Sequence, residues 1–198
     1  MDMAVDQASP VARQLVGHRL SELGMRPAQD IVRDANRIAS WRCGRIVTES
    51  ARLVGIYGRW WPCHGNWLQV LWDQHVRTAQ RDQCTIFYYQ PIGSPSFLTL
   101  SYVHSGARTT LSTFYLSTLA LDEIARLRGA DAIVCNVTND RITDRLMHRW
   151  GWKTHCHQWR GRHFIKRFYG CYPELPPYWR ARLTSDESNM VVLPGCAV

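Results

Sequence analysis

The sequence predicts an α/β domain with a mixed central sheet, helices on both faces and a C-terminal β-hairpin. Three observations predict this class. Strand-like and helix-like hydrophobic spacings alternate from residue 84 to residue 150. The almost continuously apolar segment AIVCNV, residues 132–137, follows a helical pattern that itself follows a strand pattern at 97–103, so these two strands should be parallel neighbours joined by a crossover. Two further strand-like runs occupy residues 153–169 around a turn at Arg160-Gly161.

Length and composition predict one folded domain. The chain has 198 residues, of which 45% are hydrophobic, enough for a single core. We expect a mobile start at residues 1–10, the domain at 11–172, and a proline-rich strap or tail at 173–198. No stretch approaches the roughly 20 apolar residues of a membrane helix, and the start lacks the features of a secretory signal. A cytoplasmic protein without a membrane partner is therefore expected.

The first half of the chain gives weaker signals than the second. Residues 11–23 and 28–39 carry apolar side chains at helical spacing, which predicts two amphipathic helices. Residues 41–66 are interrupted repeatedly by glycine and proline, so we expect strand and loop there. Asn66 is a suitable cap for a helix through Gln80, whose apolar residues share one broad face.

The second half gives clearer elements. Residues 84–90, CTIFYYQ, are rich in β-branched and aromatic side chains, and residues 97–103 alternate with period two, so two adjacent strands are expected. A long helical pattern over 112–128 ends at Gly129, which accepts a left-handed cap conformation at little cost. Another helix is expected at about residues 141–150, before the terminal hairpin.

The cysteine and histidine patterns predict no metal site and no disulfide framework. The seven cysteines form an odd number without a CxxC pair, so reduced thiols, several of them buried, are expected. His155 and His157 share one strand face by alternation. A turn at Arg160-Gly161 places residue 158 opposite His163, which puts His163 on the other face.

Positive charge is concentrated late in the chain. Residues 141–182 contain ten arginines or lysines against Asp144 and Glu174, which equals the whole net charge of +8. Such a segment attracts anionic partners, whether nucleic acid, an acidic protein surface or a phosphorylated cofactor. Tryptophans beside arginines, as in RWW at 59–61, suit base stacking, but core aromatics with arginines at their rim explain them equally well. Nucleic acid is the less favoured partner, because no recognised nucleic-acid-binding module is present.

The order helix, glycine, apolar strand, asparagine, helix and glycine-aromatic resembles a known family. Residues 116–152, LSTLALDEIARLRGADAIVCNVTNDRITDRLMHRWGW, are similar to the GNAT-type N-acetyltransferases, and the resemblance extends more weakly over 97–169. It implies a GNAT-like sheet and transfer of an acyl group from acetyl-CoA or another acyl-CoA to a small-molecule or peptide amine by direct attack. The alternative is a GNAT-like scaffold without turnover that binds an acidic protein or nucleic acid through residues 141–182.

The resemblance also implies a cofactor site at the start of the helix that ends at Gly129. The family's loop R/Q-x-x-G-x-G/A falls on six residues of this chain: Arg108, Thr109, Thr110, Leu111, Ser112 and Thr113. The free N–H groups of a helix start suit the CoA diphosphate, although Leu111 and Thr113 stand where the family has glycines. Thr110, Ser112 and Thr113 are equally suited to capping the helix, and Asn139 either caps the next helix or forms a hydrogen bond towards substrate or CoA.

Acid and base candidates follow from the same comparison. In the family, a tyrosine four residues before the glycine-aromatic pair reprotonates the leaving thiolate; here that position is Met147, or Leu146 when counted from Asn139. The neighbouring His148 is the candidate acid, with a water or no acid as the other readings. His104, just beyond the strand at 97–103, is the first candidate base for the amine, and Tyr102 is the second. Both histidines are also compatible with ordinary surface positions.

Overall fold

The computed structural model describes residues 26–59, 81–138, 142–156, 158 and 160–185. These residues form a mixed seven-stranded sheet with strand order β2-β1-β3-β4-β5-β7-β6. The strands are β1 (Cys43–Glu49), β2 (Arg52–Arg59), β3 (Gln83–Tyr89), β4 (Phe97–Ser105), β5 (Ala132–Val137), β6 (Lys153–Thr154) and β7 (Arg162–Arg167). The helices are α2 (Ala35–Ser40), α4 (Leu111–Leu127), α5 (Asp144–Arg149) and α6 (Pro177–Leu183). The predicted α/β class is confirmed.

The segment that the sequence left as strand and loop contains a tight hairpin. β1 and β2 pair antiparallel, with Glu49 opposite Arg52, so only two residues form the turn. Glycines inside these strands make room for rings: a Cβ on Gly44 would lie 2.5 Å from the Tyr88 hydroxyl, and a Cβ on Gly58 would lie 2.5 Å from the Trp41 indole. Glycine here is a packing requirement, which a sequence cannot distinguish from a loop signal.

The crossover from β4 through α4 to β5 is present as predicted. β4 and β5 pair in parallel from Phe97 opposite Ala132 to Leu100 opposite Cys135. α4 covers 17 residues, and its buried side includes Leu116, Ala120 and Ile124, each with no exposed surface. These side chains pack against the apolar residues of the sheet in one core. Adjacent pairing of β3 and β4 is also confirmed.

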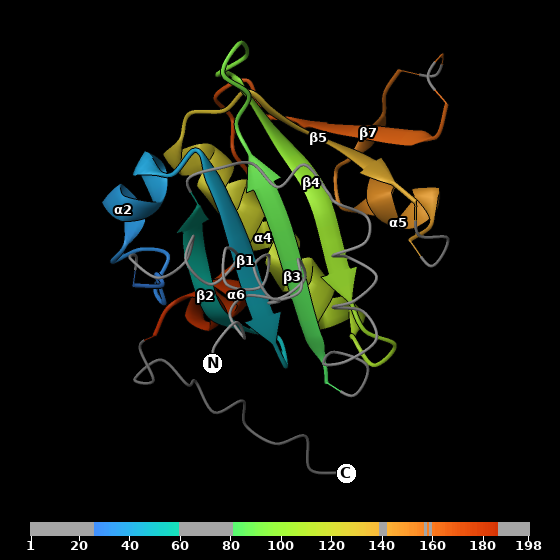
Figure 1. Ribbon diagram of the computed structural model, residues 1–198. Helices are drawn as coiled ribbons and strands as arrows, with labels where there is room; N and C mark the ends of the chain where they lie inside the picture. The colour runs from blue at the N-terminus through green and yellow to red at the C-terminus, as the bar shows by residue number, and fades with distance from the viewer. Residues whose placement is uncertain (1–25, 60–80, 139–141, 157, 159, 186–198) are drawn as a thin grey trace, which may run out of the picture.

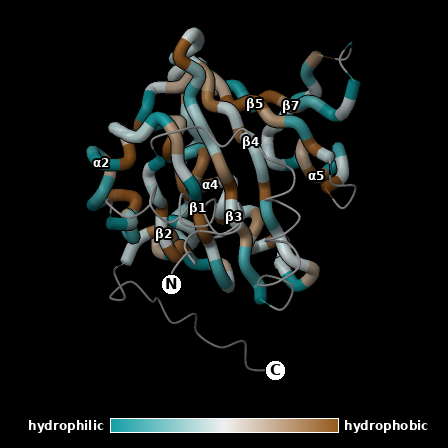
Figure 2. Tube along the Cα trace, viewed as in Figure 1, coloured by the Kyte–Doolittle hydropathy of each residue, from teal (hydrophilic) through white to brown (hydrophobic). Residues whose placement is uncertain are grey.

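The described helices lie on the α4 side of the sheet. α4 and α6 run behind the sheet in Figure 1. α2 and α6 both contact α4, and the Trp150 ring at the end of α5 stacks 5.4 Å from the Phe114 ring of α4. The sequence predicts helices on both faces; among the described residues, none covers the opposite face. Figure 2 shows hydrophobic stretches along the strands, and hydrophilic residues at the lower ends of β1 and β3.

Several element boundaries differ from prediction. The pattern at 28–39 forms a helix only from Ala35, because Ala28 is bridged to Ile56 and the Asp30 carboxylate accepts hydrogen bonds from the amides of Val32 and Arg33. α5 is shorter than the predicted 141–150 and begins after its cap, Thr143. The predicted helices at 11–23 and 66–80, and the predicted mobile residues 1–10, lie outside the described residues.

The terminal hairpin forms with a different register from the predicted one. Lys153 lies opposite Ile165, Thr154 opposite Phe164, and the His155 amide donates to the His163 carbonyl at 2.8 Å. The prediction of residue 158 opposite His163 was therefore wrong, because the connection is longer than a two-residue turn. His155 and His163 are directly opposite each other, and not on different faces as predicted.

Residues 173–185 are docked onto the domain. α6 buries Leu183 completely, and the Ile31 amide donates to the Leu183 carbonyl at 3.1 Å. The five cysteines in the described residues are free, and Cys43, Cys84 and Cys135 are buried, as the sequence predicts. Within the described part, helices are too short or too polar to cross a membrane.

Candidate functional site

The parallel strands β4 and β5 separate before either strand ends. Their pairing ends at Leu100 and Cys135, although β4 continues to Ser105 and β5 to Val137. Beyond that point β4 stays paired with β3 as far as Ser105, and β5 stays paired with β7 as far as Val137. Each strand therefore keeps its outer neighbour and loses its inner one. Figure 1 shows the two strands starting together and diverging.

A β-bulge marks the start of this separation. Tyr88 of β3 pairs with Leu100 and Phe87 pairs with Tyr102, so Ser101 is the extra residue of β4. Its hydroxyl donates to the Phe87 carbonyl at 3.1 Å. A bulge bends its strand and redirects the neighbouring backbone groups. At this position it bends β4 away from β5 immediately after their last pair.

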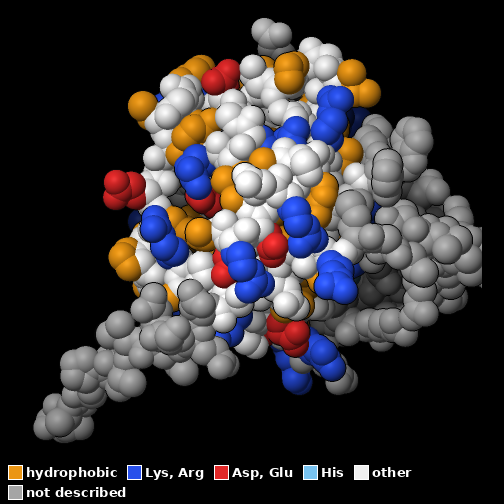
Figure 3. All heavy atoms as spheres, turned by 90° about the vertical axis from the view of Figure 1, so that its left-hand side faces the viewer, with side chains coloured by type: hydrophobic (Ala, Val, Ile, Leu, Met, Phe, Trp, Pro, Cys, Tyr) orange, Lys and Arg blue, Asp and Glu red, His pale blue; other side chains and the backbone are white. Residues whose placement is uncertain are grey.

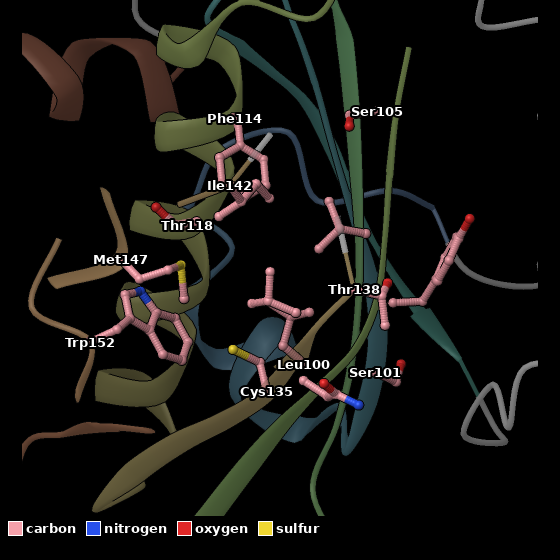
Figure 4. Close-up of a pocket in the computed structure, with 14 residues that line it drawn as sticks. Leu100, Ser101, Ser105, Phe114, Thr118, Cys135, Thr138, Ile142, Met147 and Trp152 are labelled. Atoms are coloured by element: carbon pink, nitrogen blue, oxygen red, sulfur yellow. The ribbon is translucent and has the colours of Figure 1, made fainter. Parts of the chain in front are cut away.

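A cavity of about 220 Å³ lies between the separated strands and the helices. In Figure 4, Phe114, Thr118, Met147 and Trp152 face Leu100 and Cys135 across this cavity. The lining is completed by polar residues from the strand ends and the following loop, and by apolar neighbours: Ser101, Tyr102, Val103, Ser105, Asn136, Val137, Thr138 and Ile142. Trp152 and Met147 are almost completely buried, whereas Asn136 and Thr138 are exposed. The cavity thus has an apolar interior and a polar rim.

No charged side chain lines this cavity among the described residues. Its ionisable side chains are those of Tyr102 and Cys135. Burial raises the pKa of the Cys135 thiol to about 12, outweighing the lowering effect of its hydrogen bond with the Phe164 backbone. At neutral pH this thiol is protonated and is not a nucleophile. Tyr102 is therefore the remaining candidate for proton transfer among the residues that border the cavity.

The start of α4 lies at the end of the cavity formed by the strand tips. Ser105 and Phe114 both line the cavity, so the loop that joins them is next to it. Thr110 caps the helix by accepting a hydrogen bond from the Thr113 amide at 3.2 Å. The amide of Thr109 donates to Gly106. Three of the implied loop residues thus act in the structure of the loop itself.

Asp82, just before β3, binds the same loop. Its carboxylate accepts hydrogen bonds from the Thr110 amide at 2.8 Å, the Thr110 hydroxyl at 3.1 Å and the Thr113 hydroxyl at 2.8 Å. A carboxylate at a helix start is stabilised by the free N–H groups and the helix dipole. Here a fixed anion of the protein takes up part of the position that the family resemblance assigns to a diphosphate.

The structure separates the implied cofactor residues into two groups. Thr113 is completely buried, and its hydroxyl also accepts from the Ala51 amide at 2.8 Å. Arg108, Leu111 and Ser112 are exposed, and Leu111, with 62% of its surface accessible, does not enter the cavity. Leu111 and Ser112 have amides that no described residue accepts from. Asn139 lies outside the described residues.

The two histidine candidates are not among the residues that line the cavity. His104 lies between Val103 and Ser105, and side chains alternate along a strand, so it points to the opposite side of the sheet. His148 is exposed on α5, with its ring 6.2 Å from the Phe164 ring, whereas its neighbour Met147 lines the cavity. Tyr102, the second candidate, does border the cavity, although its pairing with Phe87 places its ring on the same side of the sheet as His104.

Sequence reasoning missed three features of the site. No local signal marks Ser101 as a bulge, because the extra residue is defined only by pairing with β3. Thr118 looks like an ordinary helical residue, and only the position of α4 under the gap brings it to the cavity. Asp82 is 28 residues from Thr110, but an aspartate immediately before a strand was available as a signal for a cap on a neighbouring loop. In the described residues no group of three or more potential metal ligands occurs.

Comparisons with family models, with curated proteins and with solved structures find no match to this chain. The site is therefore defined by its own geometry: two separated parallel strands, a bulge, and an uncharged cavity beside the start of a long helix.

Proposed function

We propose that this protein is a GNAT-like N-acyltransferase that binds acetyl-CoA or another acyl-CoA in the gap between β4 and β5 and transfers the acyl group to an amine. The observation that carries the proposal is the separation of these strands at Leu100 and Cys135, with a cavity of about 220 Å³ beside it. In this gap the inner edges of two strands have no strand partner among the described residues. Strand edges bind extended chains that contain amide groups, and the pantetheine arm of CoA contains two.

The chemistry requires a polarised thioester and an unprotonated amine. The amine nitrogen attacks the thioester carbonyl carbon, the carbon–sulfur bond breaks, and the thiolate leaves. Beyond Leu100 the edge of β4 that faces the gap has no strand partner among the described residues, so a backbone amide on that edge is able to bind the developing oxyanion. The protonated Cys135 offers no thiolate for an acyl-enzyme intermediate, which supports direct attack.

Tyr102 is the proposed proton donor for the leaving thiolate. It lines the cavity, next to the bulge. A tyrosine phenol retains its proton at neutral pH and is therefore able to act as a general acid. This assignment replaces the tyrosine that the family has on the helix where this chain has Met147. The amine proton passes to solvent at the polar rim formed by Asn136 and Thr138.

A blocking substitution at the rim tests the proposal. Thr138 is exposed and lines the cavity, so Thr138→Trp should close the entrance without disturbing the core. Thr154→Trp on β6 is the matched control, because Thr154 is exposed and does not line the cavity. Calorimetry should show saturable acetyl-CoA binding to the parent and to the control, and at least about tenfold weaker binding to Thr138→Trp. Absence of binding to the parent protein, together with no acyl transfer to a panel of amines, would reject the function.

The alternative function, a scaffold that binds an acidic protein or nucleic acid, requires one continuous basic surface. The described residues do not form such a surface. The described basic residues of 141–182 are distributed over α5, β6, the loop before β7, β7 and α6, and α6 packs beside β2 and α4, away from α5 (Figure 1). Two of them are paired with acids: Arg162 with Asp144 and Lys166 with Asp122, each at 2.6 Å. Figure 3 shows basic side chains mixed with acidic and apolar ones on the face that contains α2 and β2. These observations favour the acyltransferase.

A further inference from the structure

We infer that the acyl donor is recognised by its acyl-pantetheine end and that its diphosphate contributes little to binding, with Asp82 as the residue that determines this preference. The inference rests on the proposed function and adds a donor specificity to it. It depends on two independent features, which are the hydrogen bonds at the start of α4 and the lining of the cavity.

The first feature is the small number of amides left for a diphosphate. Between Arg108 and Thr113, the amides of Thr109, Thr110 and Thr113 already donate to Gly106, Asp82 and Thr110. Phosphate sites at helix starts depend on several such amides pointing at the ligand together. Here three of them are used inside the protein, and Thr113 is additionally buried.

The negative charge of Asp82 at the start of α4 also disfavours a diphosphate there. Asp82 holds a carboxylate within hydrogen-bonding distance of Thr110, the residue directly before the two remaining amides. A diphosphate bound at those amides would lie close to this carboxylate, and like charges a few ångströms apart repel each other even with strong solvent screening. The nearest basic side chain before β3, Arg81, is paired with Glu49 at 3.8 Å. Arg108 is the only basic residue of the loop at 106–113.

The second feature is the uncharged lining of the cavity. Its interior is formed by Phe114, Met147, Trp152 and Leu100, and its polar lining groups are neutral. An apolar cavity of about 150 Å³ is large enough to hold benzene. At about 220 Å³, this cavity has room for an acyl group together with the end of the pantetheine arm. Burial of these parts, which are apolar or carry neutral amides, supplies the favourable free energy of binding.

Two donors that share the acyl-pantetheine end test the inference. Calorimetry with acetyl-CoA and with S-acetylpantetheine, which lacks the nucleotide and the diphosphate, should give dissociation constants within about fivefold of each other. Acetyl-CoA binding should weaken less than about threefold between about 50 and about 300 mM salt. An acetyl-CoA affinity more than about 30-fold tighter, or a steep salt dependence, overturns the inference and leaves the proposed function intact. Failure of both donors to bind rejects the proposed function itself.

Substitution of Asp82 provides a direct check. Asp82→Asn removes the charge, and its amide oxygen still accepts from the Thr110 amide while the neighbouring hydroxyls reorient. Acetyl-CoA should then bind about three- to tenfold more tightly, whereas S-acetylpantetheine should bind as before. Asp144→Asn, which removes an exposed carboxylate on α5, is the matched control and should change neither affinity. Equal changes for both donors in Asp82→Asn would contradict the assignment.

Discussion

At the scale of single residues, Ser101 and Tyr102 form the part of β4 that borders the cavity. Tyr102 follows the bulge and borders the cavity, and its pairing with Phe87 keeps its ring on the Phe87 side of the sheet. The Phe87 and Tyr102 rings lie 6.3 Å apart, which holds the phenol in a defined orientation. A proton donor next to the proposed thioester is the consequence.

Removal of the Tyr102 hydroxyl should therefore slow the chemical step. We expect Tyr102→Phe to lower kcat by about 100-fold, because a positioned general acid contributes in this range, and to leave KM for the acyl donor nearly unchanged. Steady-state kinetics with the best amine acceptor measures both constants. Tyr169→Phe is the control, because Tyr169 is 72% exposed and lies beyond β7. An unchanged kcat in Tyr102→Phe would show that another group supplies the proton.

A buried ion pair gives a second prediction at this scale. Asp122 of α4 and Lys166 of β7 are 2.6 Å apart, and both side chains are largely buried. Removing Lys166 leaves the Asp122 carboxylate buried without compensation, so Lys166→Met should lower the free energy of unfolding by about 3–5 kcal/mol. Replacing both, Asp122→Leu with Lys166→Met, should cost markedly less than the single change. Urea denaturation of the parent protein and of these two variants measures this difference.

The pH dependence of the same pair has a definite sign. Burial raises the pKa of the Asp122 carboxyl to about 6, although the nearby Lys166 ammonium opposes the shift. The folded state then holds the proton more tightly than the unfolded state between roughly pH 4 and pH 6. The contribution of Asp122 to the free energy of unfolding should therefore fall as pH rises through this window. Asp122→Asn should lose that slope, and a parent protein whose stability relative to the variant rises with pH there would contradict the assignment.

At the scale of elements, the β1–β2 hairpin contains backbone strain that its sequence does not relieve. Its two turn residues, Ser50 and Ala51, have φ values of 49° and 54°. Such two-residue turns normally contain Asn and Gly, because positive φ is costly for other residues. The turn is nevertheless held in place, since the Ala51 amide donates to the Thr113 hydroxyl and the Ser50 amide donates to Asp82. This strained turn is therefore anchored to the α4 start.

Glycine at the second turn position should relieve the strain. We expect Ala51→Gly to raise the free energy of unfolding by about 0.5–1 kcal/mol, after allowance for the greater freedom of glycine in the unfolded chain. Ala39→Gly in α2 is the matched control, and the same substitution in a helix should lower that free energy by about 1 kcal/mol. Thermal and urea unfolding report both values. Destabilisation by Ala51→Gly would show that the Ala51 methyl contributes more than its backbone costs.

At the scale of the whole molecule, α6 joins the two ends of the described chain. The Asp30 carboxylate accepts hydrogen bonds from the amide and hydroxyl of Ser185, at 3.0 and 3.1 Å. Arg182 donates to the Ala51 carbonyl at 3.1 Å. Leu183 is completely buried in the core. The first part of the segment that the sequence predicts to be a strap or tail therefore stabilises both the β1–β2 hairpin and the helix layer.

Shortening the buried side chain of α6 should weaken the whole domain. Leu183→Ala should lower the free energy of unfolding by about 2–4 kcal/mol, because it removes buried methyl groups and leaves a cavity. Tyr178→Ala on the same helix, where the ring is 55% exposed, should cost much less. Urea denaturation compares the two variants. Equal losses would indicate that α6 contributes through its helical structure and not through docking of Leu183.

Prediction from sequence succeeded where the signal was local and periodic. The 17-residue α4 has a continuous apolar face, and β5 is an uninterrupted apolar run, so both were predicted to within one residue. Parallel pairing of β4 and β5 followed from the crossover rule alone. The prediction for β1 and β2 was less complete because Gly44 and Gly58 look like loop residues in the sequence. The rings that require these glycines belong to Tyr88 and Trp41, and their positions beside the glycines are fixed only by the fold.

For the candidate site, the sequence by itself determined the strand-helix-strand unit and the position of the loop at 108–113, because these depend on spacing along the chain. The tertiary structure alone decided where β4 and β5 separate, that Ser101 is a bulge, and that Tyr102 rather than His104 or His148 lines the cavity. It also brought Asp82 to the start of α4. The physical reason is that register between strands and contacts across 28 residues are fixed by packing of the complete core, which no local pattern records.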